Sequence, residues 1–157
     1  MQQGKSESIE INASGLRVAI VQARFNHEVT DRLAMGALEA LERSHVLKKN
    51  ITHETVPGSA ELPFLLASFA ASGKFDALVA LGCLIKGETD HYEYIAKLVT
   101  HGIAEVSLRF LIPVGFGVLT VHNKEQAMAR CQSGESNLGF QAAMAAMEGA
   151  LKAVKIP

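Results

Sequence analysis

This sequence has few cysteines, a net charge close to zero and no long apolar run, and each of these features excludes a class of protein. The two cysteines, Cys83 and Cys131, form neither a CxxC pair nor a zinc-type spacing, so the sequence predicts no disulfide framework and favours a reducing compartment. The formal net charge is -1 and the basic residues are scattered, which leaves no electrostatic basis for binding nucleic acid or an acidic membrane.

The chain also lacks a recognisable membrane span or secretory signal. Its longest apolar run, Ala77 to Ile85, has roughly half the ~18 residues that a membrane span needs. The amino-terminal residues MQQGKSESIE contain no apolar signal-peptide core. With 157 residues, 48% of them hydrophobic and 20% charged, the sequence predicts one soluble, cytoplasmic domain over residues 1–157, without repeats or linkers.

Four segments rich in Val, Leu and Ile predict β-strands. Three are almost continuously apolar, which is typical of strands buried on both faces of a parallel sheet; they are residues 16–21, 77–81 and 114–120. Residues 51–56 alternate between apolar and polar, so we expect an edge strand there. Within the N-terminal segment, residues 1–14, the run Ile9 to Ile11 is a candidate fifth strand that would pair with a neighbouring subunit.

Helical patterns lie between the strands. Apolar residues recur every third or fourth position in helices that begin after Asn26, which is placed to cap, and at Ser59. Two more such helices cover residues 95–106 and 140–154. The alternation predicts βαβ units, and hence an α/β domain with an open, four-stranded parallel sheet between two helical layers. The Ala- and Met-rich helix at 140–154 is interpreted as either core-facing or a subunit interface, and both interpretations stay open.

Unusual residues gather where the predicted strands end. Open α/β sheets bind ligands beyond the carboxyl ends of their strands, so these segments predict an active site. The segments are Gln22 to Asn26, Pro57 to Glu61, Gly82 to His91, and Thr120 to Glu125.

The third segment suits phosphate and proton transfer. Gly87 leads a turn into a helix, whose free N–H groups and positive dipole end favour an anion. His91 lies in the first helical turn, where the dipole favours the neutral imidazole that can accept and return a proton. The alternatives are an ordinary helix start and a surface histidine. The other histidines form no His-x-x-x-His pair, so we predict no metal site.

Three further side chains each have a functional and a structural interpretation. Phe25 would stack on a flat heterocycle, or act as a hydrophobic plug. Glu61 would accept hydrogen bonds from a polyol, or complement the dipole of its helix. Arg130, beside a helix interruption, would clamp a phosphate, or remain a solvated surface residue.

Together these segments resemble lumazine synthase, over the chain from about Leu16 to Val154. Four motifs carry the resemblance, in the right order: ARFN (23–26), VPGSAELP (56–63), ALGCLIKGETDHYEY (80–94) and FGVLTVHNKEQAMAR (116–130). The resemblance implies a flavodoxin-like fold. It also implies the family's reaction, which joins 5-amino-6-(D-ribitylamino)uracil to 3,4-dihydroxy-2-butanone 4-phosphate and yields 6,7-dimethyl-8-ribityllumazine, phosphate and water, with no metal or redox cofactor.

The resemblance implies roles at the matching positions. His91 would relay protons. The residues implied to bind the ribitylamino-uracil are Phe25, Asn26, Ser59, Ala60, Glu61, Leu84, Ile85 and Phe116. Those implied to bind the butanone phosphate are Gly87, Glu88, Thr89 and Arg130. The family's site lies between adjacent subunits of a pentamer, so Phe116 and Arg130 would come from the neighbour. Free pentamers, paired pentamers and a sixty-subunit shell all stay open, and riboflavin synthase is a candidate partner.

Three positions depart from the family pattern. Ala60 stands where an aromatic is usual, which would open the wall of the ribityl pocket. Leu138 replaces the Lys of a Gly-Asn-Lys-Gly run and removes any polar contact from that side chain. Cys83 stands where Thr is common, and we interpret it as a small buried residue rather than a nucleophile.

Two other functions compete with the enzyme. A non-catalytic flavin- or pteridine-binding protein on the same scaffold would need neither the proton relay of His91 nor the clamp of Arg130. A flavodoxin-like electron carrier would need a Ser/Thr/Gly-rich phosphate loop after the first strand, where ARFN stands instead. Both features favour the enzyme.

Overall fold

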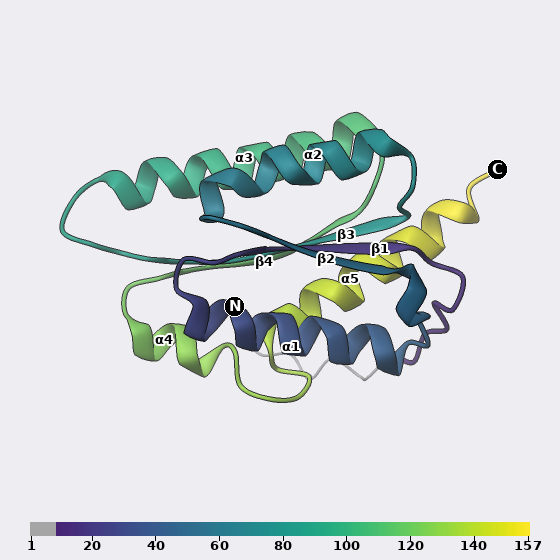
Figure 1. The fold of residues 1–157 in the computed structure, drawn as a ribbon, viewed down its shortest axis with the longest axis horizontal. Coiled ribbons are helices and arrows are strands. Elements are labelled where there is room, and N and C mark those ends of the chain that lie inside the picture. The colour runs from purple at the N-terminus through teal and green to yellow at the C-terminus, as the bar shows by residue number, and fades with distance from the viewer. Residues whose placement is uncertain (1–8) are drawn as a thin grey trace.

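Four parallel strands form the centre of this protein, described here over residues 9–157 by a computed structural model (Figure 1). The strands are β1 (Val18–Ala23), β2 (Ile51–Val56), β3 (Ala77–Ile85) and β4 (Val114–Val121). The helices are α1 (His27–Arg43), α2 (Leu62–Ser72), α3 (His91–Phe110), α4 (Lys124–Ala129) and α5 (Leu138–Val154). Short 3₁₀ turns cover Lys48–Asn50 and Ser59–Glu61.

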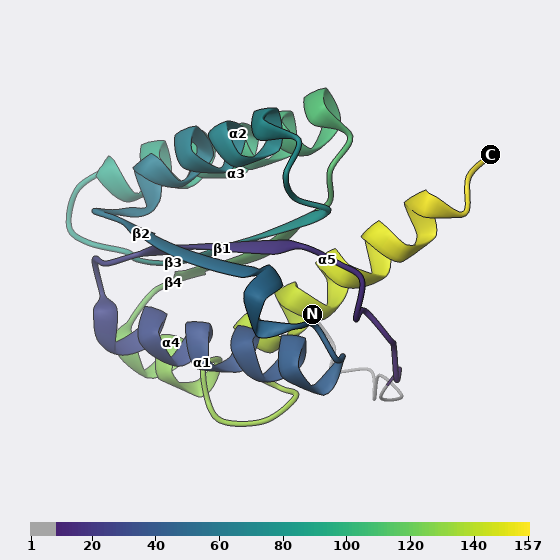
Figure 2. The ribbon, with the colours of Figure 1, turned by 45° about the vertical axis from the view of Figure 1, so that its right-hand side comes forward.

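The strand order is β2-β1-β3-β4, and every neighbouring pair is parallel. Helices α2 and α3 cover one face of the sheet, while α1, α4 and α5 cover the other (Figures 1 and 2). The predicted three-layer α/β fold with a four-stranded parallel sheet is therefore confirmed. Strand β2 lies at an edge, as its alternating pattern predicted, and its residues His53, Glu54 and Thr55 are exposed.

The apolar runs in β1 and β3 supply two separate cores. Ile20 and Val79 pack into the core that contains α1 and α5, whereas Val21 and Ala80 pack into the core beneath α2 and α3. Successive side chains of a strand point to opposite faces, so a central strand between two helical layers needs apolar residues at every position. This explains why these two segments show no alternation.

Helix α5 packs closely on α1. A Cβ added at Gly139 would lie 1.9 Å from the Leu33 carbonyl oxygen, so only glycine permits this approach. The buried Asn137 caps α5, since its Oδ1 accepts from the N–H groups of Gly139 and Phe140, and its Nδ2 donates to the Arg32 carbonyl oxygen at 3.1 Å. The core-facing interpretation of this helix is confirmed, and its role as an interface stays a prediction.

The helix predicted from Ser59 begins differently. Ser59–Glu61 form a 3₁₀ turn, and α2 starts only at Leu62. The Glu61 carboxylate accepts a hydrogen bond from the Gly58 N–H at 2.9 Å, which satisfies a donor at the entrance of the turn. Pro63 stands in the first turn of α2, as expected.

The N-terminal prediction is tested only in part. Residues 9–11 have no strand assignment and lie outside the four-stranded sheet, while residues 1–8 of the N-terminal segment fall outside the described residues. Pairing with a neighbouring subunit stays a prediction. Among the described residues, none of the helices combines the length and apolarity that a bilayer span requires.

Both cysteines are free and buried. Burial raises the pKa of Cys83 to about 11, so its thiol is protonated at neutral pH. This agrees with the interpretation of Cys83 as a packing residue rather than a nucleophile.

Candidate active site

The carboxyl ends of the strands meet at one edge of the sheet, on the left of Figure 1. The loops that lead into α1, α2, α3 and α4 all leave from this edge. Parallel strands bring these four segments together although they are far apart in the sequence. The predicted location of the site therefore agrees with the fold.

The loops that follow β1, β2 and β3 are called the first, second and third loops. Backbone hydrogen bonds join the first loop to the second. The N–H of Arg24 donates to the Val56 carbonyl oxygen at 2.8 Å, and the N–H of Phe25 donates to the Pro57 carbonyl oxygen at 3.0 Å. The Arg24 guanidinium also donates to the Thr55 hydroxyl at 3.1 Å. These contacts extend the pairing of β1 and β2 beyond the sheet and fix the backbone on which Phe25 stands.

Asn26 joins the first loop to the third. Its backbone is left-handed, with φ of 59°, a conformation that asparagine tolerates better than most residues. Its side-chain amide donates to the Cys83 carbonyl oxygen at 2.8 Å. Asn26 is the N-cap residue of α1, as predicted, but its side chain makes no capping hydrogen bond, because its amide donates to β3 instead. The contact instead ties the loop to the strand segment that carries Leu84 and Ile85.

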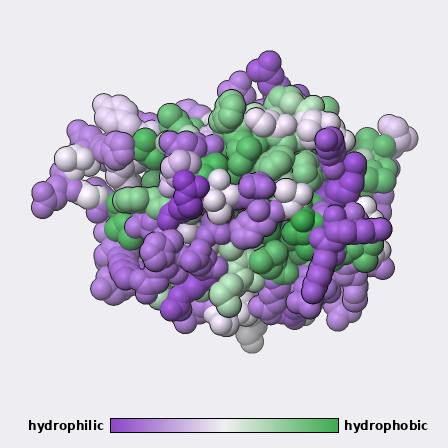
Figure 3. Space-filling model, viewed as in Figure 1, coloured by the Kyte–Doolittle hydropathy of each residue, from purple (hydrophilic) through white to green (hydrophobic). Residues whose placement is uncertain are grey.

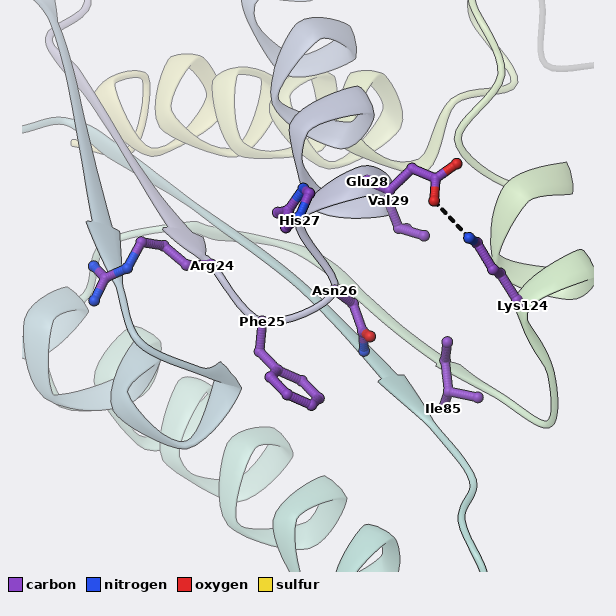
Figure 4. Close-up of a pocket in the computed structure, with 8 residues that line it drawn as sticks. All are labelled: Arg24, Phe25, Asn26, His27, Glu28, Val29, Ile85 and Lys124. Atoms are coloured by element: carbon purple, nitrogen blue, oxygen red, sulfur yellow. Dashed lines mark ion pairs between the residues drawn. The ribbon is translucent and has the colours of Figure 1, made fainter.

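Phe25 does not act as a hydrophobic plug. Phe25 is 71% exposed, and its side chain extends away from the loop backbone (Figure 4). Beside it lies a cavity of about 410 Å³. The cavity is lined by Arg24, Phe25, Asn26, His27, Glu28, Val29, Ile85 and Lys124. An exposed aromatic at the rim of a cavity is available for stacking, as the functional interpretation requires.

The cavity also contains an ion pair that sequence reasoning missed. Lys124 of α4 reaches toward Glu28 in the first turn of α1, and the two side chains form a salt bridge (Figure 4). The hydrogen bond and charge of Lys124 lower the pKa of Glu28. Lys124 lay within a segment singled out from the sequence, but no local pattern shows that its partner is Glu28.

The second loop packs against β3. Ser59 is buried, and a Cβ added at Gly82 would lie 2.5 Å from the Ser59 hydroxyl oxygen. Glycine at this position therefore allows the loop to rest on the strand. Ala60 is half-buried and Glu61 is exposed, so both sit at the surface of this edge. The predicted ribityl-binding residues thus share one short turn beside the end of β3.

The third loop is an exposed turn in front of α3. The Lys86 N–H donates to the Val121 carbonyl oxygen at 2.9 Å and marks the end of the sheet. Gly87, Glu88 and Thr89 follow, all exposed, and α3 starts at His91. Asp90 precedes the helix without capping it through its side chain. A long helix whose amino terminus faces solvent suits an anion.

Phe116 and Arg130 lie outside this cavity. Phe116 is on the edge strand β4 and is 40% exposed. Arg130 follows α4, is exposed, and donates to the Gln126 carbonyl oxygen at 2.9 Å. Of the thirteen residues predicted for the site, Phe25, Asn26 and Ile85 line the cavity of this single chain.

The described part of the chain shows no metal ligand set. Among residues 9–157 there is no cluster of three or more His, Cys, Asp or Glu side chains arranged to hold a metal ion. The expectation that the reaction needs no metal or redox cofactor stays a prediction.

Comparison with known proteins identifies the family. The family model described as 6,7-dimethyl-8-ribityllumazine synthase matches residues 15–153. A relative from Desulfovibrio desulfuricans with that name is 44% identical over 139 residues, covering 88% of this chain and 89% of the relative. One from Campylobacter concisus, of the same name, is 46% identical over 132 residues, covering 84% and 85%. The chain therefore belongs to the 6,7-dimethyl-8-ribityllumazine synthase family.

Proposed function

We propose that this protein condenses 5-amino-6-(D-ribitylamino)uracil with 3,4-dihydroxy-2-butanone 4-phosphate to give 6,7-dimethyl-8-ribityllumazine, phosphate and water. Family membership supports the reaction. The observation that carries it to this chain is the placement of exposed Phe25, the Ser59–Glu61 turn and the start of α3 at the same edge of the sheet, where the strands end. This edge offers a stacking surface, polar groups for a polyol and an anion-binding helix end.

In this proposal the heterocycle and its ribityl chain bind against the first two loops. Phe25 stacks on the uracil ring, while Asn26, Leu84, Ile85 and the neighbour's Phe116 bound the ring pocket. Ser59 and Glu61 hydrogen-bond to the ribityl hydroxyls, with Ala60 leaving the wall open. Backbone hydrogen bonds to Val56 and Pro57 and one side-chain hydrogen bond to β3 hold this surface before the substrate arrives, which reduces the entropy lost on binding.

The butanone phosphate binds against the third loop. Its phosphate accepts from the turn of Gly87, Glu88 and Thr89, beside the positive end of α3, and pairs with Arg130 of the adjacent subunit. The uracil amine attacks the butanone carbonyl, and loss of water gives an imine. Phosphate then leaves, and the second amine closes the ring with loss of a further water. The phosphate contacts stabilise the negative charge of the leaving group.

His91 moves protons between these steps. It is the first residue of α3 and lies two positions after the last residue of the phosphate turn, so its imidazole adjoins the reacting carbons in the proposed complex. Each addition and elimination transfers protons to or from nitrogen and oxygen, and an imidazole can perform both directions.

The decisive experiment mixes the purified protein with both substrates and follows the absorbance and fluorescence of the lumazine. We expect product formation well above the uncatalysed rate, and no product when either substrate is omitted. A protein that binds the uracil tightly yet leaves the rate at its uncatalysed value would be the non-catalytic flavin- or pteridine-binding protein instead.

Replacement of Phe25 should weaken binding of the heterocycle. Stacked aromatic pairs contribute about 0.5–1.5 kcal/mol beyond area burial, so we expect Phe25→Ala to raise Kd for the ribitylamino-uracil by up to about tenfold. The side chain is exposed, so the protein should stay folded. Isothermal titration calorimetry measures the change, and Phe25→Tyr, which keeps the ring, is the matched control. Unchanged affinity in folded Phe25→Ala would rule out stacking.

The proposal includes assembly into pentamers, with each site completed by a neighbour. An apolar groove of about 290 Å³ lies between α2 and α3, beside Phe64, whose side chain is 78% exposed. Figure 3 shows apolar residues gathered over this helical layer at the top of the view. Leu108 and Leu111 of the same layer are also highly exposed. Such a surface suits burial between subunits.

A cytoplasmic location and an association with riboflavin synthase complete the proposal.

A charge in the groove should disrupt this assembly. We expect Phe64→Glu to sediment as a monomer or dimer in analytical ultracentrifugation, because burying an unpaired carboxylate in an apolar interface is unfavourable. Phe64→Leu keeps an apolar side chain and should assemble like the wild type. Circular dichroism checks that both variants are folded. Pentamers of Phe64→Glu would place the interface elsewhere, and a monomeric wild type would refute assembly altogether.

A further inference from the structure

A polar network centred on a buried glutamine crosses three elements on the α1 side of the sheet. Gln22 of β1 is 4% exposed, although the rest of its strand is apolar. Its Nε2 donates to Asp31 Oδ1 at 2.6 Å and to the Thr30 hydroxyl at 3.3 Å, both on α1. Its Oε1 lies 2.8 Å from Nε2 of His53 on β2. One glutamine thus connects β1, β2 and α1.

The chemistry of the partners fixes the direction of each hydrogen bond. The Asp31 carboxylate can only accept, so the amide nitrogen of Gln22 must face α1 and its oxygen must face β2. The amide oxygen can only accept as well, so His53 must carry a proton on Nε2. Partial desolvation of its ring lowers the pKa of His53, although the charges of Glu54 and Asp31 act to raise it, and the neutral imidazole is favoured. A fully satisfied network of this kind has a single orientation.

The network encloses the loop that presents the stacking residue. Gln22 lies just before the loop, and Thr30 and Asp31 lie just after it on α1. The enclosed stretch holds Phe25 and Asn26. A buried leucine at Gln22 would fill the core without the cost of desolvating an amide, so packing alone does not explain a glutamine here.

We propose that Gln22 is a positioning residue, which fixes the two ends of the β1–α1 loop and so holds Phe25 in its stacking orientation. This inference rests on the proposed function for its catalytic consequence, but its structural part stands on the hydrogen bonds alone. Gln22 lines no part of the cavity and touches no reacting atom. Its loss should therefore weaken the uracil site and spare the phosphate site.

Two substitutions remove the connection and one preserves it. Gln22→Leu deletes all the hydrogen bonds while keeping the size of the side chain. Asp31→Ala deletes the strongest bond to α1, whereas Asp31→Asn retains an oxygen that can accept from Gln22 Nε2. Asp76→Asn is the control for general destabilisation, because it weakens the Arg17–Asp76 salt bridge near the start of β3. That pair lies at the opposite ends of the strands from the loop.

The first measurement is hydrogen exchange, which needs no activity. The N–H groups of Arg24 and Phe25 donate to Val56 and Pro57, so their exchange reports loop order. We expect these amides to exchange about tenfold faster in Gln22→Leu and Asp31→Ala, with amides in β3 unchanged and Asp31→Asn close to the wild type. Asp76→Asn should lower Tm without affecting the loop amides.

The second measurement separates the substrates. We expect Gln22→Leu and Asp31→Ala to raise KM and Kd for the ribitylamino-uracil several-fold, with KM for the butanone phosphate unchanged. A Gln22→Leu protein with lower Tm but wild-type loop exchange and uracil affinity would overturn the inference and make the network purely structural. If Gln22→Leu does not fold, the comparison of Asp31→Ala with Asp31→Asn decides. A wild type that makes no lumazine would refute the proposed function, while the exchange result would still decide the positioning role.

Discussion

Replacing Arg130 by alanine is expected to raise KM for the butanone phosphate by roughly 10- to 150-fold and to slow turnover. The estimate follows from the loss of one charge-assisted hydrogen-bonding contact, which is worth about 1.5–3 kcal/mol. The fold should survive, because the side chain is exposed and its hydrogen bond within this chain goes to the Gln126 carbonyl oxygen. Affinity for the ribitylamino-uracil should change little.

Steady-state kinetics with each substrate varied in turn measures this effect. Arg130→Lys keeps the charge without the two-pronged geometry of the guanidinium and should fall between alanine and the wild type. Lys152→Ala removes an exposed charge on α5 that the proposal does not use, and should behave like the wild type. Equal weakening of both substrates, or of neither, would show that Arg130 does not bind the phosphate.

A mixture of variants tests which subunit supplies Arg130. In the proposal each site combines His91 of one subunit with Arg130 of its neighbour. Pentamers assembled from Arg130→Ala and His91→Ala subunits would then contain some sites with both native side chains. Such mixtures should be more active than either variant alone. If both residues acted within one chain, every site would lack one of them and mixing would restore nothing.

The layers of the fold could be predicted from the sequence because the burial of a strand determines which residue types it contains. The continuous apolar runs of β1 and β3 reflect contact with helices on both faces, and the polar alternation of β2 reflects its place at the edge. The predicted location of the candidate site rests on the same pattern, since parallel strands bring their carboxyl ends to one edge.

Contacts between distant segments could not be predicted in this way. Asn26 has a residue type and position suited to capping α1, yet its amide bonds to the carbonyl oxygen of Cys83 on β3. Gln22 likewise acquires its role from His53 and Asp31, which lie on two other elements. A sequence pattern shows which groups a residue can offer, and the fold determines which partner lies within reach.

His91 presents the last and most demanding test. Imine formation between an amine and a carbonyl already proceeds in water, so much of the rate enhancement can come from holding two reactants together. A single acid–base group contributes about 10²- to 10⁴-fold. We expect His91→Ala to lower kcat by ~10²-fold or less, at the low end of that range, because water and the substrates can also carry protons. The residue is exposed at the start of α3, so folding, assembly and KM should stay close to those of the wild type.

The pH dependence of kcat distinguishes a proton relay from a merely polar residue. A protonated imidazole cannot accept a proton, so a catalytic His91 makes the wild-type kcat fall on the acid side of the profile. His91→Gln keeps a polar side chain that does not titrate, so the fall in kcat at acid pH should disappear in this variant. A general loss of activity from altered packing would instead lower kcat equally at every pH. Persistence of the fall at acid pH in His91→Gln would assign it to another group and leave His91 as an ordinary residue at a helix start.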